Sequence, residues 1–199
     1  MHRRRLLTGI PLLVTPLAGC QRDPRSSQDH PRYSITGFEV SQPTEARVSF
    51  DAALIQSTLA PDRRAKILLA VENPGTTPVY IRSGPNPPFG VPRAVHRSDG
   101  NVDATLVLWQ DEYRQPGDGI EVHDGEVSVA ETHTWTELPP SRSTSEIFEI
   151  RYDRERLTTG VFRVSRAHRT ATRLPPSALR SVAYEIRFRI ETPETDRWV

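Results

Sequence analysis

Hydrophobic and polar residues alternate along most of the chain from Tyr33 onward, which is the pattern of β-strands with one buried and one wet face. The clearest segment is 182–190, where apolar residues occupy every second position and mostly charged residues lie between them. A second segment, 46–56, alternates in the same way and places Val48 and Phe50 on one side. Each of these segments predicts a half-buried strand.

Residues 66–72 are apolar on both sides, as in a strand at the centre of a sandwich. A turn at residues 73–76, which read Asn-Pro-Gly-Thr, leads to an alternating segment at 79–82, so the two segments predict a hairpin. Residues 51–59 come nearest to a helical period, and a strand interpretation competes with it there. Three shorter strand candidates are residues 104–109, 146–152 and 161–165.

Residues 120–129 give the most explicit local prediction. Asp124-Gly125 is a favoured pair for a two-residue type I′ turn, so this segment predicts a short two-stranded hairpin. In that register, valine and isoleucine pairs face one side and polar pairs face the other. The expected cross-strand pairs are Val122 with Val127, Ile120 with Val129, His123 with Glu126 and Glu121 with Ser128.

About eight or nine short strands separated by turns predict an all-β fold, an antiparallel β-sandwich of immunoglobulin-like type. The length of 199 residues suits one ordinary domain with a single core. We expect that domain to span residues 33–195.

Residues 1–19 have the three-part layout of a secretory signal, with a basic tip, an apolar run and small residues before Cys20. The apolar run is shorter than the roughly 20 residues that span a bilayer. Leu17-Ala18-Gly19-Cys20 resembles the lipobox of bacterial and archaeal lipoproteins, in which the cysteine receives a diacylglyceryl group and signal peptidase cuts before it. The resemblance implies lipidation of Cys20 and a lipid anchor on the extracytoplasmic face of the cell membrane, with residues 20–32 as a flexible tether. The alternative is an ordinary cleavage site with a chance cysteine.

Arg3, Arg4, Leu6 and Leu7 fit the pattern R-R-x-[FL]-L of twin-arginine export signals, which direct folded proteins through their own translocon. General secretion signals also carry basic residues at this position, so both export routes stay open. Signals of this kind joined to β-rich domains are similar to those of haloarchaeal lipoproteins.

The order of elements between residues 66 and 164 resembles that of lipoprotein sandwich domains, including the intracellular-proteinase-inhibitor-like (BsuPI-like) modules. The residues that carry the resemblance are Glu72-Asn73-Pro74-Gly75, Gly100 with Leu106-Val107-Leu108-Trp109, Leu138-Pro139-Pro140-Ser141 and Thr159-Gly160-Val161-Phe162. Two turns that usually carry Pro-Gly in that family read Pro-Pro and Thr-Gly here. The resemblance implies the sandwich fold. Inhibition of a proteinase would need an exposed extended loop, and the segment from Arg82 to Pro92 is the candidate.

Composition excludes several classes of protein. Cys20 is the only cysteine, so disulfides within the chain and zinc sites built from cysteine are excluded. The formal net charge is +1, and three arginines lie in the predicted signal, so the mature chain lacks the basic excess of nucleic-acid-binding proteins. The sequence contains no phosphate-binding glycine loop, G-x-S-x-G or H-E-x-x-H motif. We therefore expect no catalytic residues, no cofactor, no metal site and no nucleic-acid partner.

Two segments are candidate contact surfaces. In the first, prolines stiffen a loop whose Phe89 is either displayed at a rigid tip or folded back on the core. In the second, aromatic and acidic residues at a strand end either form a contact surface or belong to the core and its rim. The first consists of Pro85, Asn86, Pro87, Pro88 and Phe89, and the second of Trp109, Asp111, Glu112 and Tyr113.

Residues 99–103 begin like a calcium-binding loop but lack its later ligands, so we interpret them as a turn before a strand. From all these features we expect a membrane-anchored lipoprotein that acts as a non-enzymatic binding or structural module. Its partner would be an envelope protein or a small ligand. A proteinase inhibitor of BsuPI-like type is the alternative.

Overall fold

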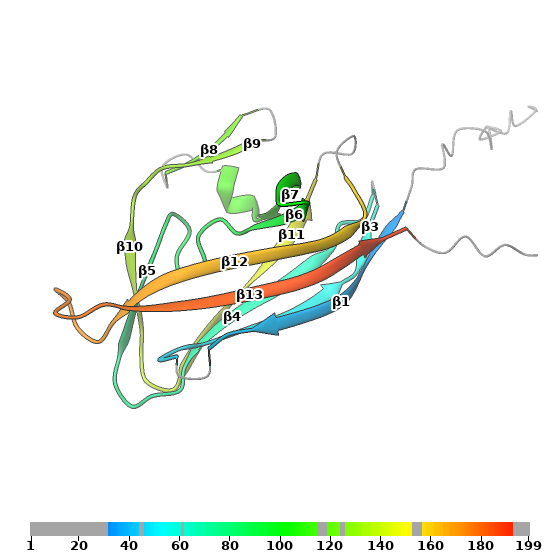
Figure 1. The fold of residues 1–199 in the computed structure, drawn as a ribbon. Coiled ribbons are helices and arrows are strands. Elements are labelled where there is room, and N and C mark those ends of the chain that lie inside the picture. Colours follow the sequence, from blue (N-terminus) through cyan, green and yellow to red (C-terminus); the bar gives the residue numbers. More distant parts are fainter. Residues whose placement is uncertain are drawn as a thin grey trace, which may run out of the picture.

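The computed structural model describes residues 32–43, 46–60, 62–114, 119–123, 126–152 and 157–192. This part of the chain consists of β-strands, connecting turns and one short 3-10 helix, and it contains no α-helix (Figure 1). The elements are β1 (Tyr33–Ser41), β2 (Ser49–Gln56), β3 (Thr58–Leu59), β4 (Lys66–Asn73), β5 (Val79–Ser83), β6 (Arg93–Ser98), β7 (Asn101–Trp109), η1 (Asp111–Arg114), β8 (Ile120–His123), β9 (Glu126–Val129), β10 (Thr134–Leu138), β11 (Arg142–Arg151), β12 (Gly160–Ala171) and β13 (Arg180–Glu191).

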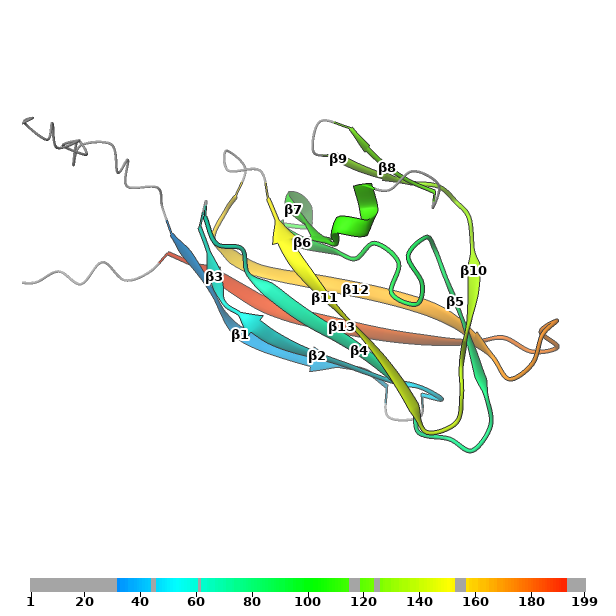
Figure 2. The ribbon, with the colours of Figure 1, turned by 180° about the vertical axis from the view of Figure 1, so that it is seen from behind.

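The strands form a sandwich whose two layers belong to one sheet. Among the described residues, this 11-stranded sheet has the order β2-β4-β11-β7-β6-β12-β13-β1-β3, with β5 and β10 branching from it. β3 follows β2 directly along the chain and pairs with β1, so the two ends of the sheet meet and the sandwich is nearly closed. Figures 1 and 2 show β2, β4 and β11 lying over β12 and β13. The predicted class, an all-β antiparallel sandwich of immunoglobulin-like type, is confirmed, with more strands than the sequence indicated.

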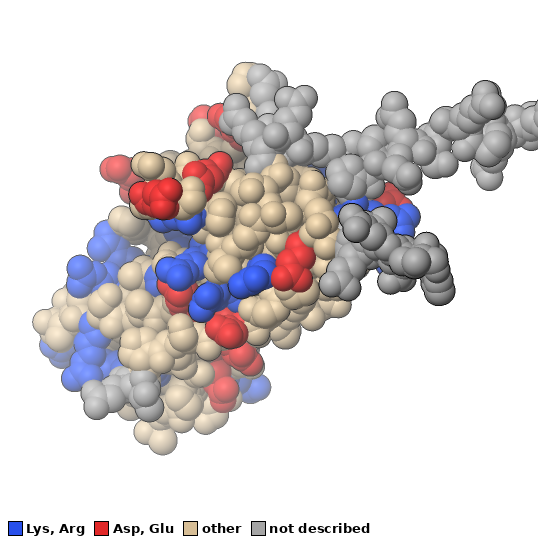
Figure 3. All heavy atoms as spheres, turned by 45° about the vertical axis from the view of Figure 1, so that its right-hand side comes forward, with Lys and Arg blue, Asp and Glu red and all other residues tan. Residues whose placement is uncertain are grey.

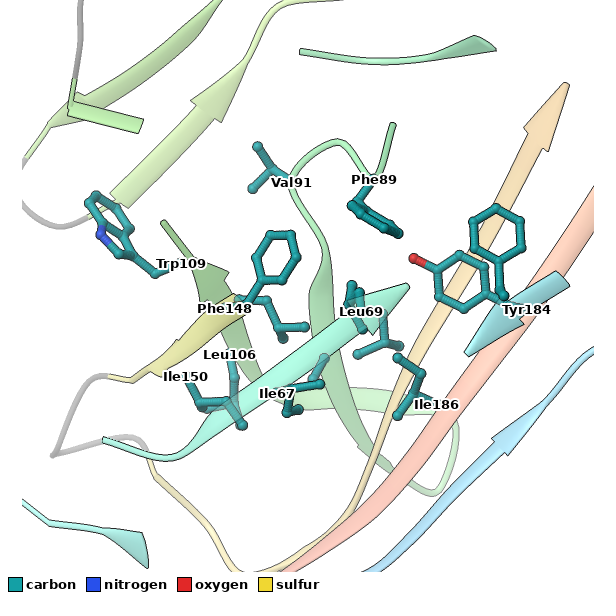
Figure 4. Close-up of a cluster of buried hydrophobic side chains, with 14 of the residues drawn as sticks. Ile67, Leu69, Phe89, Val91, Leu106, Trp109, Phe148, Ile150, Tyr184 and Ile186 are labelled. Atoms are coloured by element: carbon teal, nitrogen blue, oxygen red, sulfur yellow. The ribbon is translucent and has the colours of Figure 1, made fainter. Parts of the chain in front are cut away.

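The core lies between the two layers. The side chains of β13 alternate as predicted, and the five apolar ones are at most 4% exposed. Figure 4 shows side chains of β4 and β11 facing β13, with two further residues from the loop after β5. The labelled members of this cluster are Ile67, Leu69, Phe89, Val91, Leu106, Trp109, Phe148, Ile150, Tyr184 and Ile186.

The hairpin predicted from residues 66–72 and 79–82 is wrong. β4 pairs with β2 and β11, whereas β5 pairs with β10 and β12. The chain therefore crosses from one layer to the other between β4 and β5. β10 and β11 make the same crossing, so the paired ribbon of β4 and β11 continues around a corner as the ribbon of β5 and β10.

A buried asparagine holds this corner. The side chain of Asn73 is 0% exposed, and its Nδ2 donates to the carbonyl oxygens of Thr77 and Leu138, both at 2.9 Å, and of Pro139 at 3.2 Å. Its Oδ1 accepts a hydrogen bond of 3.0 Å from the backbone N–H of Gly75. This turn sequence resembles a hairpin loop, but here it carries the chain from one layer to the other. It does so because carbonyl groups distant in the sequence accept hydrogen bonds from the side-chain amide of Asn73.

The predicted hairpin at 120–129 is present as β8 and β9, with the expected register from Ile120 opposite Val129 to His123 opposite Glu126. The two turn residues of this hairpin lie outside the described residues. Between β6 and β7, Asp99 and Gly100 have positive φ angles of 48° and 84°, which is the backbone of a tight hairpin turn. The interpretation of this segment as a turn is confirmed.

Two further segments bear on the strand predictions. In residues 51–59 all but Ser57 belong to β2 or β3, so the strand interpretation there is confirmed. β12 runs from Gly160 to Ala171, far beyond the predicted 161–165. Its inward positions continue as Arg166, His168 and Thr170, and these polar side chains hid the alternation.

Candidate functional site

The two candidate segments from the sequence meet at one open depression of about 480 Å³, which we call the β11 depression. One residue comes from the loop after β5, two come from the chain after β7, and most of the others come from β11. The lining residues are Leu68, Asn86, Gln110, Glu112, Ser145, Glu146 and Ile147.

The depression exists because two neighbouring strands have different lengths. β11 pairs with β4 from Arg142 to Glu149, but with β7 only from Glu149 to Arg151. β7 ends at Trp109, and the chain then turns away into η1. The depression therefore lies where a longer β7 would have continued along β11.

Glu146 is the polar centre of the β11 depression. Its Oε2 accepts hydrogen bonds from Gln110 Nε2 at 2.7 Å and from Asn86 Nδ2 at 3.5 Å. Asn86 also donates to Gln110 Oε1, so the three side chains form one network. Burial raises the pKa of Glu146, and the nearby Glu112 carboxylate adds to this effect, whereas the two amide donors lower the pKa. The result is a partly buried carboxylate that two amides hold in place.

A buried tyrosine and a half-buried arginine lie next to this network. Tyr113 is 2% exposed, and its hydroxyl donates to the carbonyl oxygen of Gly90 at 3.4 Å. Arg166 Nη2 donates to the carbonyl oxygen of Val91 at 2.8 Å. Burial raises the pKa of Tyr113 and lowers the pKa of Arg166. Gly90 has a φ of 68°, which favours glycine, and a Cβ there would lie 2.8 Å from Arg166 Nη2, so a larger residue would strain the backbone and displace the guanidinium.

The strand end at Trp109 is packed into a cluster of its own. The Arg151 guanidinium lies 3.7 Å from the centre of the indole ring, and Arg114 lies 5.6 Å from it. The ring of Tyr113 meets the indole edge-on at 5.5 Å. Asp111 accepts from the indole N–H at 3.4 Å and lies 3.6 Å from Arg151. This cluster fixes the point at which β7 ends, and therefore one wall of the β11 depression.

A model of the family described as Domain of unknown function (DUF8130) matches residues 1–194. The chain belongs to this family. The match extends over the N-terminal residues as well as over the strands. No curated protein and no solved structure matches the chain.

In this DUF8130 chain the proline segment does not protrude. Pro85, Pro88 and Phe89 are buried, and Phe89 is 0% exposed with its ring edge-on to Phe148 at 6.0 Å. Asn86 and Pro87 are half-buried, and of these Asn86 reaches the β11 depression. Of the two interpretations of Phe89, the structure therefore shows the one in which it folds back on the core. A buried segment also lacks the exposed, extended backbone that a proteinase-inhibiting loop needs.

The second segment selected from the sequence also has both buried and exposed residues. Trp109 and Tyr113 are buried, each 2% exposed, whereas Asp111 and Glu112 are exposed. The aromatic residues thus belong to the core, and only Glu112 lines the β11 depression.

Gln110, Glu146 and Arg166 are not among the site residues predicted from the sequence. Glu146 and Arg166 were detectable in principle, because each takes an inward position in an alternating strand, where an apolar residue is expected. Gln110 gave no such signal, since it follows the end of β7. Its role depends on contacts with residues distant in sequence.

Cys20 and the export residues Arg3, Arg4, Leu6 and Leu7 lie outside the described residues. The part of the chain that the structure describes has no helix that is long and apolar enough to cross a membrane. The same part has no group of three or more His, Cys, Asp or Glu side chains placed to hold a metal ion. Figure 3 shows acidic and basic side chains together on one face of the molecule, with neither sign covering all of it.

Proposed function

We propose that this DUF8130 protein is a binding module, anchored by lipid on Cys20 at the extracytoplasmic face of the cell membrane, and that the β11 depression is its ligand site. The lipobox-like sequence before Cys20 supports the anchor. The β11 depression supports the binding role, because it is open and brings polar groups from three separate elements to one place.

The observation that carries the proposal is the network around Glu146. A carboxylate oriented by two side-chain amides is a preorganised acceptor, and a ligand that binds it need not first order the site. Leu68 and Ile147 supply apolar surface beside this network. Polar groups that set orientation, next to apolar groups that supply contact area, are typical of recognition sites.

The anchor is tested by separating membranes from soluble proteins after expression of the full chain. We expect wild-type protein in the membrane fraction and the Cys20→Ser variant in the soluble fraction, because two acyl chains give stable anchoring. Ser26→Ala, six residues further along the predicted tether, is the matched control and should stay with the membranes. A Cys20→Ser protein that remains membrane-bound after its signal is removed would show that lipid at this residue is not the anchor.

The site is tested by NMR on the ¹⁵N-labelled full chain with a panel of amines, sugars, nucleotides and short peptides. We expect at least one class to shift the side-chain amides of Asn86 and Gln110. The Asn86→Gly variant removes one amide and suits the positive φ of 62° at this position, so it should weaken binding and leave the fold intact. Glu72→Gln, on an exposed position of β4 outside the depression, is the control. Shifts confined to other surfaces, or no shifts with any class, would refute the proposed site.

A further inference from the structure

The backbone of β11 is open along the β11 depression. Ile150 N–H donates to the carbonyl oxygen of Ala65 on the β4 side at 2.9 Å. Backbone groups of successive residues in an antiparallel strand point to alternate sides, so those of Ser145 and Ile147 point away from β4. That is the side on which β7 has already ended, since its pairing with β11 starts only at Glu149.

The β11 edge, by which we mean the outward backbone groups of Ser145 and Ile147, borders the depression, because both residues line it. Among the described residues, no hydrogen bond to these groups is found on the side of η1. An unpaired strand edge of this kind is a template for one more strand. The edge and the depression therefore form one continuous surface.

The side chains around the β11 edge indicate which strand would fit. Glu146 and the exposed Glu112 both line the depression, so a positive group there would meet two carboxylates. Ile147 is 51% exposed and lies opposite Leu68 in the ladder, which gives an apolar strip beside the carboxylates. Lysine and arginine have an apolar stem and a charged tip, so the stem fits the apolar strip and the tip fits the carboxylates.

We propose that the β11 edge takes up an extended segment of a partner protein as an added β-strand, and that a lysine or arginine of that segment enters the β11 depression. This proposal rests on the proposed function, because it names the ligand class of the same site. Main-chain hydrogen bonds would give affinity, and the pocket for one side chain would give specificity.

A second copy of this chain is a poorer occupant of the edge. Two β11 edges paired with each other would bring Glu146 and Glu112 of both copies close together. Like charges facing each other across a strand pair are destabilising, so the acidic lining disfavours self-pairing and favours a basic partner.

The probe is a capped peptide of alternating threonine and valine with one central lysine, titrated into the ¹⁵N-labelled full chain. We expect shifts and slowed hydrogen exchange at the amides of Ser145 and Ile147. N-methylation of the peptide backbone on its pairing edge keeps every side chain, removes the donors and should weaken binding about tenfold or more. Replacing lysine by norleucine should weaken binding to a similar extent, about tenfold.

Two protein variants complete the test. Glu146→Gln should bind the lysine peptide about tenfold more weakly but bind the norleucine peptide as wild type does, and Glu72→Gln should change neither affinity. Equal binding of the methylated and unmethylated peptides would overturn strand addition and leave the proposed function standing.

Two further outcomes would also overturn strand addition. One is binding of other panel compounds, but of no peptide, at the depression. The other is protection of the Ser145 and Ile147 amides that grows with protein concentration, which would assign the edge to self-association. If no compound of any class binds at the depression, the proposed function fails as well.

Discussion

His168 links the stability of the core to pH. The ring is 5% exposed and lies against the aromatic rings of Phe50 and Tyr184, with centroid distances of 5.2 and 5.9 Å. Its Nε2 has no hydrogen-bond partner among the described residues. Burial, assisted by the nearby positive charge of Arg166, lowers the pKa of His168 to about 4, although a hydrogen bond to the backbone of Arg82 opposes this change.

The lowered pKa sets the sign and size of the effect. In the unfolded chain the ring has its ordinary pKa of 6.5, so between pH 6.5 and about 4 the unfolded state binds the proton more readily than the folded state. The contribution of His168 to stability is therefore complete above pH 6.5 and is lost as the pH falls toward 4. At about 1.4 kcal/mol per pKa unit, the loss is roughly 3 kcal/mol.

The assay is urea unfolding of the full chain from about pH 7 to about pH 4, followed by tryptophan fluorescence, to which the buried Trp109 contributes. His168→Asn replaces the ring N–H by an amide N–H, so it keeps a hydrogen-bond donor, but it cannot titrate. It should be less stable at pH 7, because it loses the ring stack, and it should lose roughly 3 kcal/mol less than wild type on acidification. Exposed His133, changed to Asn, is the matched control and should follow wild type. Equal acid losses in wild type and His168→Asn would refute the reasoning.

Three further changes test other parts of the fold. Gly160→Ala should destabilise the chain by roughly 2 kcal/mol or more, because the φ of Gly160 is 141° and a Cβ there would lie 2.6 Å from the His96 ring. Thermal unfolding measures this loss, and an unchanged melting temperature would contradict it. Asn73→Ala should cost roughly 2–4 kcal/mol in urea unfolding, because three carbonyl groups at the corner lose their donor. Glu146→Gln should raise stability at pH 7, because burial disfavours the charged carboxylate and raises its pKa; a less stable variant in urea unfolding would argue against that.

Local patterns in the sequence predicted the strands better than their partners. The alternation at β13 and the turn pair between β8 and β9 are local signals. The structure has the alternation of β13, and it pairs β8 with β9 in the expected register. The hairpin after β4 failed because its turn residues are also suited to a corner. That choice is made by the contact of Asn73 with Leu138, which is 65 residues away.

The candidate site was predicted only in pieces. Asn86 and Glu112 belong to the segments selected from sequence, and both line the β11 depression. For Phe89 the sequence left two positions open, displayed or folded back on the core, because the choice depends on packing against Phe148 in a distant strand. Glu146 is detectable as a polar residue at an inward position of β11, but its network is not, because the partners come from two loops and no spacing along the chain records them.

The early end of β7 has a consequence for how this architecture can change. The depression is a mismatch in strand length, created where one strand stops and its neighbour goes on. Residue pairs added after Trp109 would extend β7 along β11 and narrow the hollow, while Leu108 and Trp109 keep their places between the layers. Recognition could thus diverge by changes in length at one strand end, independently of the interior that keeps the chain folded.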